Sequence, residues 1–435
     1  MSQQVKDAVF EALTSKSGNL ADPDISETAR DHEADSFLRH VASLSATKIA
    51  DGLIDPKLVL SWLLTTLGAP AALLGLLVPI RESGALFPQM FTAGALRRLK
   101  RRKWAWAGGS LVQGLAAMAM GAAAVTLTGT AAGWSILGAL TVLALARSVC
   151  SVTYKDVLGK TIAKSRRGTV TGTAGSIGAG AVLAYGSLLT FAGDNRFPLV
   201  AGGLMLAGVL WLFAATAFAT LKEDASETAP AANPIRSLTD DFKLLARDAQ
   251  LRRFILVRAL LTSTALAPPF MVALGTQAET ARSMFGGLGL LVVASASAGL
   301  LSSYVWGRLA DRSSRKVLIL TGLSGALALF GTLGLNAAGL LSASAGLPAM
   351  IFILMIAYQG VRLGRSTHLV DMASAKTRAA YTALSNTIIG TVLILGGGFS
   401  LVAATWGISA VIAILGVMSA VASLFALGLK EVQSA

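Results

Sequence analysis

Long apolar runs alternate with short polar segments along the chain. Each run has roughly the 20 residues that a helix needs to cross the hydrocarbon core of a bilayer. The pattern predicts helices at 42–64, 71–96, 104–127, 134–160, 169–192, 198–221, 252–275, 284–307, 317–340, 348–373, 381–404 and 407–429. We therefore expect an all-α integral membrane protein with twelve transmembrane helices in two pseudo-symmetric six-helix bundles.

Two polar segments divide the chain into four predicted regions. The first segment is acidic, and the second separates the two sets of six helices. The regions are an acidic cytoplasmic N-terminal tail at 1–41, an N-terminal bundle at 42–221, a cytoplasmic linker at 222–250 and a C-terminal bundle at 251–430.

Composition supports a membrane protein. Of the 435 residues, 54% are hydrophobic and 14% are charged, whereas soluble domains carry about 25% charged residues. The net charge of +14 does not indicate nucleic-acid binding, because the basic residues are clustered in short turns between apolar runs.

The basic turns predict the orientation in the membrane. Lys and Arg gather at 97–103, 164–167 and 308–316, whereas the alternate turns at 65–70 and 128–133 carry no basic residue. Basic turns remain on the cytoplasmic side. We therefore expect a multi-pass protein of the inner membrane with both termini in the cytoplasm.

Two of the basic turns resemble each other. GRLADRSSRK at Gly307–Lys316 and GALRRLKRRK at Gly94–Lys103 share their first glycine, a leucine two residues later and a final Arg-Lys, which is Arg315-Lys316 in one and Arg102-Lys103 in the other. The first sequence resembles the turn after helix 8 of major facilitator superfamily transporters. LTTLGAPAALLGLL at 64–77 and RRGTVTG at 166–172 resemble other turns of that family in the expected order.

This resemblance implies a secondary transporter that works by alternating access between two halves. It also implies a conformational motif in the two turns. Asp311 would contact a helix N-terminus of the neighbouring half, and the arginines would pair with acids there. The motif residues are Gly307, Asp311, Arg312, Arg315, Lys316, Gly94 and Arg102. The first copy has Arg98 at the position of Asp311, which favours a role in topology alone for that turn.

Charged residues inside the predicted spans are the candidates for substrate binding or proton coupling, because such residues are costly in a membrane and usually functional. Asp55 precedes Pro56, where we expect a kink in the first helix. The candidates are Asp51, Asp55, Arg81, Glu82, Arg147, Tyr358, Gln359, Arg362, Arg365, His368 and Asp371.

Two interpretations of these residues remain open. In one, the carboxylates exchange protons while arginines, above all Arg147 and Arg362, bind an anionic substrate. In the other, Asp51 with Lys48 and Asp156 with Lys155 are structural ion pairs, and an apolar cavity serves proton-driven multidrug efflux of lipophilic compounds. His368 either relays protons or is a hydrogen-bond partner near a helix end.

Other classes of function receive little support. The chain has no Gly-x-x-x-x-Gly-Lys-Ser/Thr phosphate loop, and its only histidines are His32, His40 and His368. We therefore expect no cofactor, no metal site and no enzymatic activity, with an intramembrane enzyme as the alternative of another class. The expected partners are a small-molecule substrate, protons and the lipid bilayer, without nucleic acid, and the expected state is a monomer.

Overall fold

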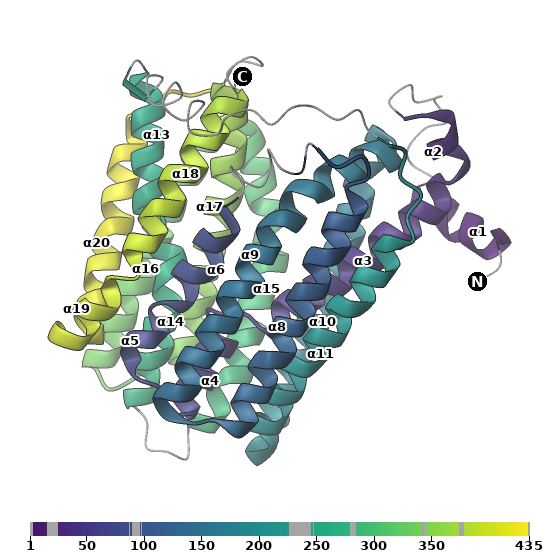
Figure 1. Ribbon diagram of the computed structural model, residues 1–435. Helices are drawn as coiled ribbons and strands as arrows, with labels where there is room; N and C mark the ends of the chain where they lie inside the picture. Colours follow the sequence, from purple (N-terminus) through teal and green to yellow (C-terminus); the bar gives the residue numbers. More distant parts are fainter. Residues whose placement is uncertain are drawn as a thin grey trace.

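The computed structural model describes residues 3–14, 25–86, 88, 96, 98–225, 245–246, 248–278, 284–341, 345–373 and 378–433. Every regular element in this part of the chain is a helix. Two short helices, α1 (Gln3–Thr14) and α2 (Glu27–Asp31), precede the long helices that form the body of the molecule (Figure 1).

The long helices form two groups, which we call the first half and the second half. The first half contains α3 (Glu33–Leu53), α4 (Val59–Thr66), α5 (Ala71–Leu74), α6 (Leu77–Leu86), α8 (Lys103–Thr126), α9 (Gly129–Thr161), α10 (Lys164–Phe191) and α11 (Arg196–Ala219). The second half contains α13 (Ala249–Leu260), α14 (Ser263–Ala278), α15 (Met284–Arg312), α16 (Ser314–Ala337), α17 (Gly346–Met372), α18 (Arg378–Gly396), α19 (Phe399–Trp406) and α20 (Ile408–Leu427).

Packing within each half is extensive. In the first half α8 packs against α9 and α11, and α3 packs against α10 and α11. In the second half α16 packs against α17 and α20, and α15 packs against α17. The halves meet where α10 lies against α15 and where α6 lies against α18.

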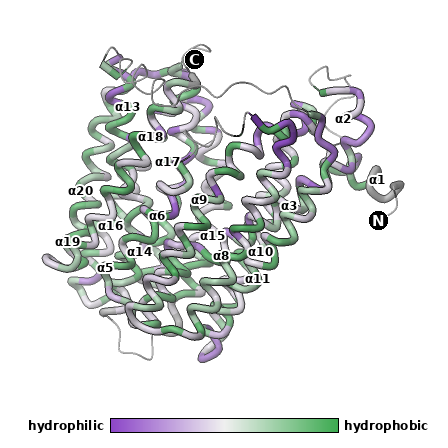
Figure 2. The backbone as a smooth tube through the Cα atoms, viewed as in Figure 1, coloured by the Kyte–Doolittle hydropathy of each residue, from purple (hydrophilic) through white to green (hydrophobic). Residues whose placement is uncertain are grey.

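The helices have the length and surface of membrane spans. The described part of the chain contains nine helices that are long and apolar enough to cross a membrane, or ten if the bent α15 is one span. Large apolar side chains face outward, including Phe191 and Trp406, which are 87% and 74% exposed. Apolar residues follow the helices between their ends, and polar residues gather at the end that carries α2 and the C-terminus (Figure 2). The chain is a multi-pass membrane protein.

The first predicted span is broken, as Pro56 predicts. Helix α3 ends at Leu53 and α4 begins at Val59, because proline has no N–H to donate and disfavours a helical residue before it. The N–H of Lys57 instead donates to Asp55 Oδ1 over 2.8 Å. The break places polar backbone groups and charged side chains in the middle of the bundle.

The N-terminal segment packs against the turn between α9 and α10. Glu33 pairs with Arg166 and accepts the N–H of Ala163 over 2.9 Å. The rings of Phe10 and Phe37 meet edge to face with centroids 5.3 Å apart. The predicted boundary between tail and bundle, at 41/42, therefore falls inside α3.

We call the end of the molecule where α8 and α16 begin the basic end. Helices α13, α10 and α18 also begin there, and α9, α15 and α17 end there. It is the upper end in Figure 1, where the C-terminus lies, whereas the N-terminus lies at the right edge of the view, beside α1. The other end, with the turn between α4 and α5, is the opposite end.

Candidate substrate site

Two clusters of charge lie inside the first half. In the first cluster, Asp51 of α3 accepts from Arg81 of α6 over 2.8 Å and pairs with Arg147 of α9 over 2.7 Å. One carboxylate therefore joins three helices. Sharing it between two guanidinium groups satisfies both oxygens and lowers the cost of burying the arginines.

The second cluster joins the two halves. The ammonium group of Lys57, in the break between α3 and α4, lies 3.1 Å from Glu82 Oε1 and 3.2 Å from the hydroxyl of Tyr358. The Tyr358 hydroxyl also lies 3.1 Å from Glu82 Oε1, to which it donates, and Lys57 Nζ lies 4.4 Å from the centre of the tyrosine ring. Lys57 is only 9% exposed, so its ammonium group is shielded from water, whereas the side chain of Glu82 is 31% exposed.

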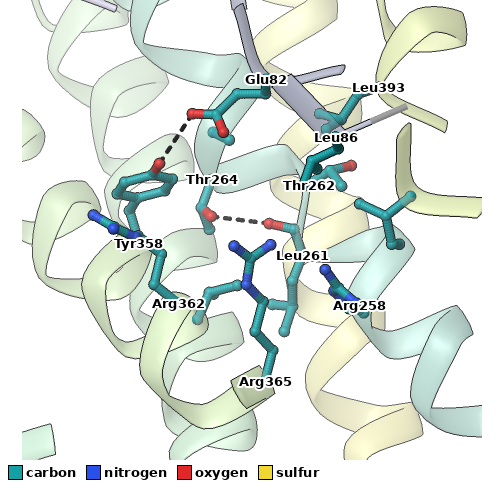
Figure 3. Close-up of a pocket in the computed structure, with 13 residues that line it drawn as sticks. Glu82, Leu86, Arg258, Leu261, Thr262, Thr264, Tyr358, Arg362, Arg365 and Leu393 are labelled. Carbon is teal, nitrogen blue, oxygen red and sulfur yellow. Dashed lines mark hydrogen bonds between the residues drawn. The ribbon is translucent and has the colours of Figure 1, made fainter. Parts of the chain in front are cut away.

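A pocket lies beside the second cluster, between α6, α13, α14, α17 and α18. It encloses about 440 Å³, which includes the part open to solvent. Its lining residues are Glu82, Leu86, Arg258, Leu261, Thr262, Thr264, Ala265, Tyr358, Val361, Arg362, Arg365, Ile389 and Leu393. Figure 3 shows the guanidinium group of Arg365 in the middle of the pocket, whereas that of Arg362 lies beside the Tyr358 ring, with its Cζ 5.9 Å from the ring centre.

The three arginines of the pocket differ from those of the first half. Arg258 is 6% exposed, and its Nη1 and Nη2 donate to Ser385 Oγ over 2.5 Å and Asn386 Oδ1 over 2.9 Å, which are both neutral partners. No carboxylate of the described residues lies within ion-pair distance of any of the three. The pocket therefore carries positive charge that no carboxylate of the described residues pairs with.

The halves approach each other closely near the opposite end. A Cβ on Gly75, directly after α5, would lie 2.2 Å from Ser400 Oγ and 2.8 Å from Phe270 Cζ, both in the second half. A Cβ on Gly289 of α15 would lie 2.2 Å from the backbone nitrogen of Thr190 in α10. Only glycine permits these contacts, and a core of buried apolar residues from both halves surrounds them. The pocket is therefore closed towards the opposite end.

Comparisons with known proteins identify the fold. No protein-family description matches the chain, and no curated protein matches it by sequence. Several solved structures match nearly all of it. A mutant of the nucleoside transporter NupG has a TM-score of 0.69 and 13% identity, with 91% of this chain and 100% of that chain covered. A D-xylose–proton symporter has a TM-score of 0.67 and 12% identity, with 92% and 98% covered.

A POT family transporter in complex with 5-aminolevulinic acid has a TM-score of 0.69 and 10% identity, with 90% of this chain and 95% of that chain covered. The chain has the major facilitator fold. The fold class expected from the hydrophobic pattern and from the two turn motifs is confirmed.

Within the major facilitator fold, the predicted site residues fall into separate groups. Asp51, Arg81 and Arg147 form the first cluster, whereas Glu82, Tyr358, Arg362 and Arg365 line the pocket. Asp55 holds the N–H of Lys57 beside the second cluster. Arg147, which we expected to bind substrate together with Arg362, is paired with Asp51 and is not part of the pocket lining.

Three predicted residues of α17 lie away from the pocket. Gln359 faces Gly299 of α15, where a Cβ would lie 3.3 Å from its Nε2. His368 is buried, its Nδ1 lies 2.8 Å from Ser314 Oγ, and its ring stacks on Phe254. Asp371 accepts from Gln433 over 2.7 Å. His368 and Asp371 therefore bind the start of α16 and the C-terminal segment.

The predicted structural ion pairs were assigned to the wrong partners. Asp51 pairs with Arg81 and Arg147, not with Lys48. Asp156 pairs with Arg102 and with Lys160, not with Lys155. Adjacent residues such as Asp156 and Lys155 point to different sides of a helix, whereas residues four apart share a face.

The two resembling turns of the major facilitator fold have different environments. In the first, the carboxylate of Glu223 accepts the N–H groups of Arg102 and Lys103 over 3.1 and 2.7 Å, at the start of α8. In the second, Lys316 N–H donates to Ser313 Oγ over 3.1 Å, and Arg315 lies 3.7 Å from Glu431.

Asp311 and Arg312 are exposed, and no contact is described for either side chain. Gly94 lies outside the described residues, and Gly307 has open space around it. The conformational role of this motif stays a prediction.

Sequence reasoning missed two residues of the site, Lys57 and Arg258. Both are basic residues inside predicted spans, so the signal that selected Arg362 was present for them as well. Lys57 was passed over in favour of the neighbouring acids. Arg258 precedes Arg362 and Arg365 by about a hundred residues, and only the fold brings the three arginines together.

Proposed function

We propose that the chain is a secondary transporter that moves a small organic anion across the inner membrane by alternating access, coupled to protons. The solved structures with the same fold include a nucleoside transporter, a D-xylose–proton symporter and a POT family transporter. Their shared architecture supports the transport mechanism, and the charges of the pocket support the class of substrate.

The observation that carries the proposal is the position of the pocket between the halves. The second cluster connects Lys57 and Glu82 of the first half with Tyr358 of the second half, and Glu82 and Tyr358 also line the pocket. A ligand in the pocket therefore touches the same side chains that hold the halves together. This is the arrangement that coupling between binding and opening requires.

Alternating access requires contacts that form on one side when they break on the other. The close contacts of Gly75 and Gly289 seal the opposite end, which the positive-inside rule places outside the cytoplasm. The structure then corresponds to a state that is open towards the cytoplasm. Opening to the outside would separate Gly75 from Ser400 and bring the basic ends of the halves together.

Glu82 is the side chain through which we expect proton coupling. As a carboxylate it pairs with Lys57 and accepts from Tyr358. Protonation removes its charge and weakens both contacts, which loosens the tie between the halves. A proton on Glu82 and an anion among the arginines would thus act on one interface.

The pocket also argues against efflux of lipophilic cations. Although Leu86, Leu261 and Leu393 contribute apolar surface, the three arginines repel a cationic compound. Arg258, Arg362 and Arg365 together favour an anion over a neutral or cationic solute.

Proteoliposomes test the proposal directly. Purified protein is reconstituted, and uptake of a panel of radiolabelled organic anions is measured with and without a pH gradient. We expect at least one anion to accumulate against its concentration gradient in the wild type. Glu82→Gln should lose the accumulation that the pH gradient drives but retain exchange of labelled for unlabelled substrate.

The matched control is Glu27→Gln, which changes an exposed acid of α2 far from the pocket. It should transport like the wild type. Accumulation by Glu82→Gln at the wild-type level would contradict the coupling role. Saturable uptake of neutral or cationic compounds alone would contradict the anion assignment and favour the multidrug alternative.

A further inference from the structure

The charges of the pocket do not balance. Arg258, Arg362 and Arg365 contribute three positive charges with no carboxylate partner among the described residues. Glu82 lines the same pocket, but its charge is already shared with Lys57 over 3.1 Å. The sum over these five groups is about three positive charges in a wall that also contains leucine and valine.

Arg258 shows that this charge is built into the pocket wall. It is 6% exposed, and Ser385 and Asn386 fix its two terminal nitrogens. Its Nε is buried without a hydrogen-bond partner. A buried guanidinium that keeps one donor unused is costly. A negatively charged ligand would offset that cost.

The other polar groups of the pocket leave anion binding to the arginines. The hydroxyl of Thr262 donates to the carbonyl of Ala259 over 2.6 Å, and that of Thr264 donates to the carbonyl of Leu261 over 2.9 Å, the second of which is drawn in Figure 3. Their hydrogens are therefore engaged. Arg362 and Arg365 are three residues apart on α17, which places them on one face about 4.5 Å apart along the axis. Each guanidinium group can bind a pair of oxygen atoms.

We infer that the substrate is a small organic dianion, a dicarboxylate or a phosphate monoester, held by Arg362 and Arg365 with Arg258 behind them. This inference rests on the proposed transport function and narrows its substrate class. A monoanion would leave two guanidinium groups uncompensated in the pocket, whereas a dianion leaves one, which the hydrogen bonds to Ser385 and Asn386 partly satisfy. Both kinds of dianion present oxygen atoms in the planar or tetrahedral arrangement that arginine binds.

Thermal stabilisation of the purified full chain tests the charge requirement. The probes are succinate against succinamate, which differ by one carboxylate, and glycerol phosphate against glycerol, all at pH 7.5. A ligand that binds the folded state raises the melting temperature. We expect a dianion to raise it by several degrees at a concentration at which its matched partner has no effect.

Variants locate the effect in the pocket. Arg362→Gln and Arg365→Gln should each weaken the apparent affinity for the dianion by about tenfold or more, because each loses a charge-assisted contact. Arg252→Gln is the matched control, since Arg252 is an exposed arginine at the basic end of the same half that bonds to the Leu245 and Ala246 carbonyls. It should bind like the wild type.

The outcomes separate the alternatives. Stabilisation by succinate alone supports a dicarboxylate, and stabilisation by glycerol phosphate alone supports a phosphate monoester. Equal stabilisation by succinate and succinamate would overturn the dianion while leaving an anion transporter in place. Stabilisation by neutral solutes only would overturn both the dianion inference and the proposed anion transport. An equal loss of affinity for the dianion in Arg252→Gln and Arg362→Gln would show that surface charge, rather than the pocket, attracts the ligand. That result would also overturn the inference.

Discussion

The two halves of the molecule treat their buried charges differently. In the first half each buried cation of the two clusters has an acid beside it, because Asp51 serves Arg81 and Arg147, and Glu82 serves Lys57. In the second half the three pocket arginines have only neutral partners or none among the described residues. Among the described residues, the buried cations of these clusters in the first half each have an acid partner, whereas the pocket arginines of the second half have none.

We propose that this difference separates structural charges from ligand-binding charges. A charged side chain in a membrane span costs free energy, so we expect a charge without an ion-pair partner only where another interaction stabilises it. In the first half, ion pairs within the protein provide this stabilisation. Among the described residues no acid pairs with the pocket arginines of the second half. We therefore propose that the arginines bind a substrate and that the Asp51 cluster is a scaffold.

The largest expected effect comes from disrupting the first cluster. Asp51→Asn leaves Arg81 and Arg147 without their shared carboxylate, and we expect a loss of about 3 kcal/mol in the free energy of unfolding, since two partly buried cations then face each other unpaired. The matched change in the other half, Arg362→Gln, removes an unpaired charge and should leave stability unchanged or slightly higher. Thermal unfolding in detergent measures both.

Asp311→Asn is the control for this pair, because Asp311 is exposed and no contact is described for it. It should change stability by less than about 0.5 kcal/mol. If Arg362→Gln destabilised the protein as strongly as Asp51→Asn, Arg362 would be a structural charge, and the distinction between the halves would be lost.

The architecture was largely predictable from the sequence, because the bilayer fixes the length of a span and the basic turns alternate. The break at Pro56 was predictable for the same local reason. The division of 71–96 at Gly75, between α5 and α6, was not. There the sequence is apolar throughout, and the close approach of Ser400 and Phe270 to Gly75 is a tertiary contact.

The site was predictable as a set of residues but not as an arrangement. Charge within a span selected Asp51, Glu82 and Arg362 without showing which of them pair. Pairing depends on helix packing, since Glu82 meets Lys57 across a helix break and meets Tyr358 across the interface between halves. For the same reason the sequence predicted that Arg147 acts together with Arg362, although in the structure Arg147 pairs with Asp51.

A smaller effect tests the point where the halves meet. Tyr358→Phe keeps the ring beside Lys57 but removes the hydroxyl that contacts both Lys57 and Glu82. Losing hydrogen bonds worth about 1 kcal/mol should shift the ratio of access states by about fivefold. The measurement is the rate at which an impermeant thiol reagent labels Leu86→Cys in the pocket, with the native Cys150 buried.

Tyr304→Phe is the control, because Tyr304 is an exposed tyrosine of α15 outside the pocket. When Tyr304→Phe is combined with Leu86→Cys, the cysteine should be labelled at the same rate as in Leu86→Cys alone. Identical rates in Tyr358→Phe and Tyr304→Phe would mean that the second cluster does not hold the halves in this state, and Glu82 would lose its place in the coupling proposal.

The smallest expected effect concerns Asp248, which caps the start of α13, the helix that carries Arg258. Asp248 precedes α13, accepts the N–H groups of Gln250 and Leu251 over 2.8 and 3.1 Å, and accepts the Tyr381 hydroxyl of α18 over 2.7 Å. Burial raises the pKa of Asp248, but the bonds from Tyr381 and the two N–H groups outweigh it and hold the pKa below its usual value.

A lowered carboxyl pKa adds stability above the unfolded value of about 3.9, and that stability is lost as the pH falls through the folded value. Asp248→Ala should therefore lower stability by about 1 kcal/mol or less from pH 7 to 5, since it loses a helix cap that is partly screened by water. The difference from the wild type should shrink below pH 4. Melting temperatures across this range measure it, and a difference that grew on acidification would mean that Asp248 contributes through something other than its charged form. In that case the second half would hold Arg258 in place without an acid at the base of its helix, which would make the contrast with the first half sharper still.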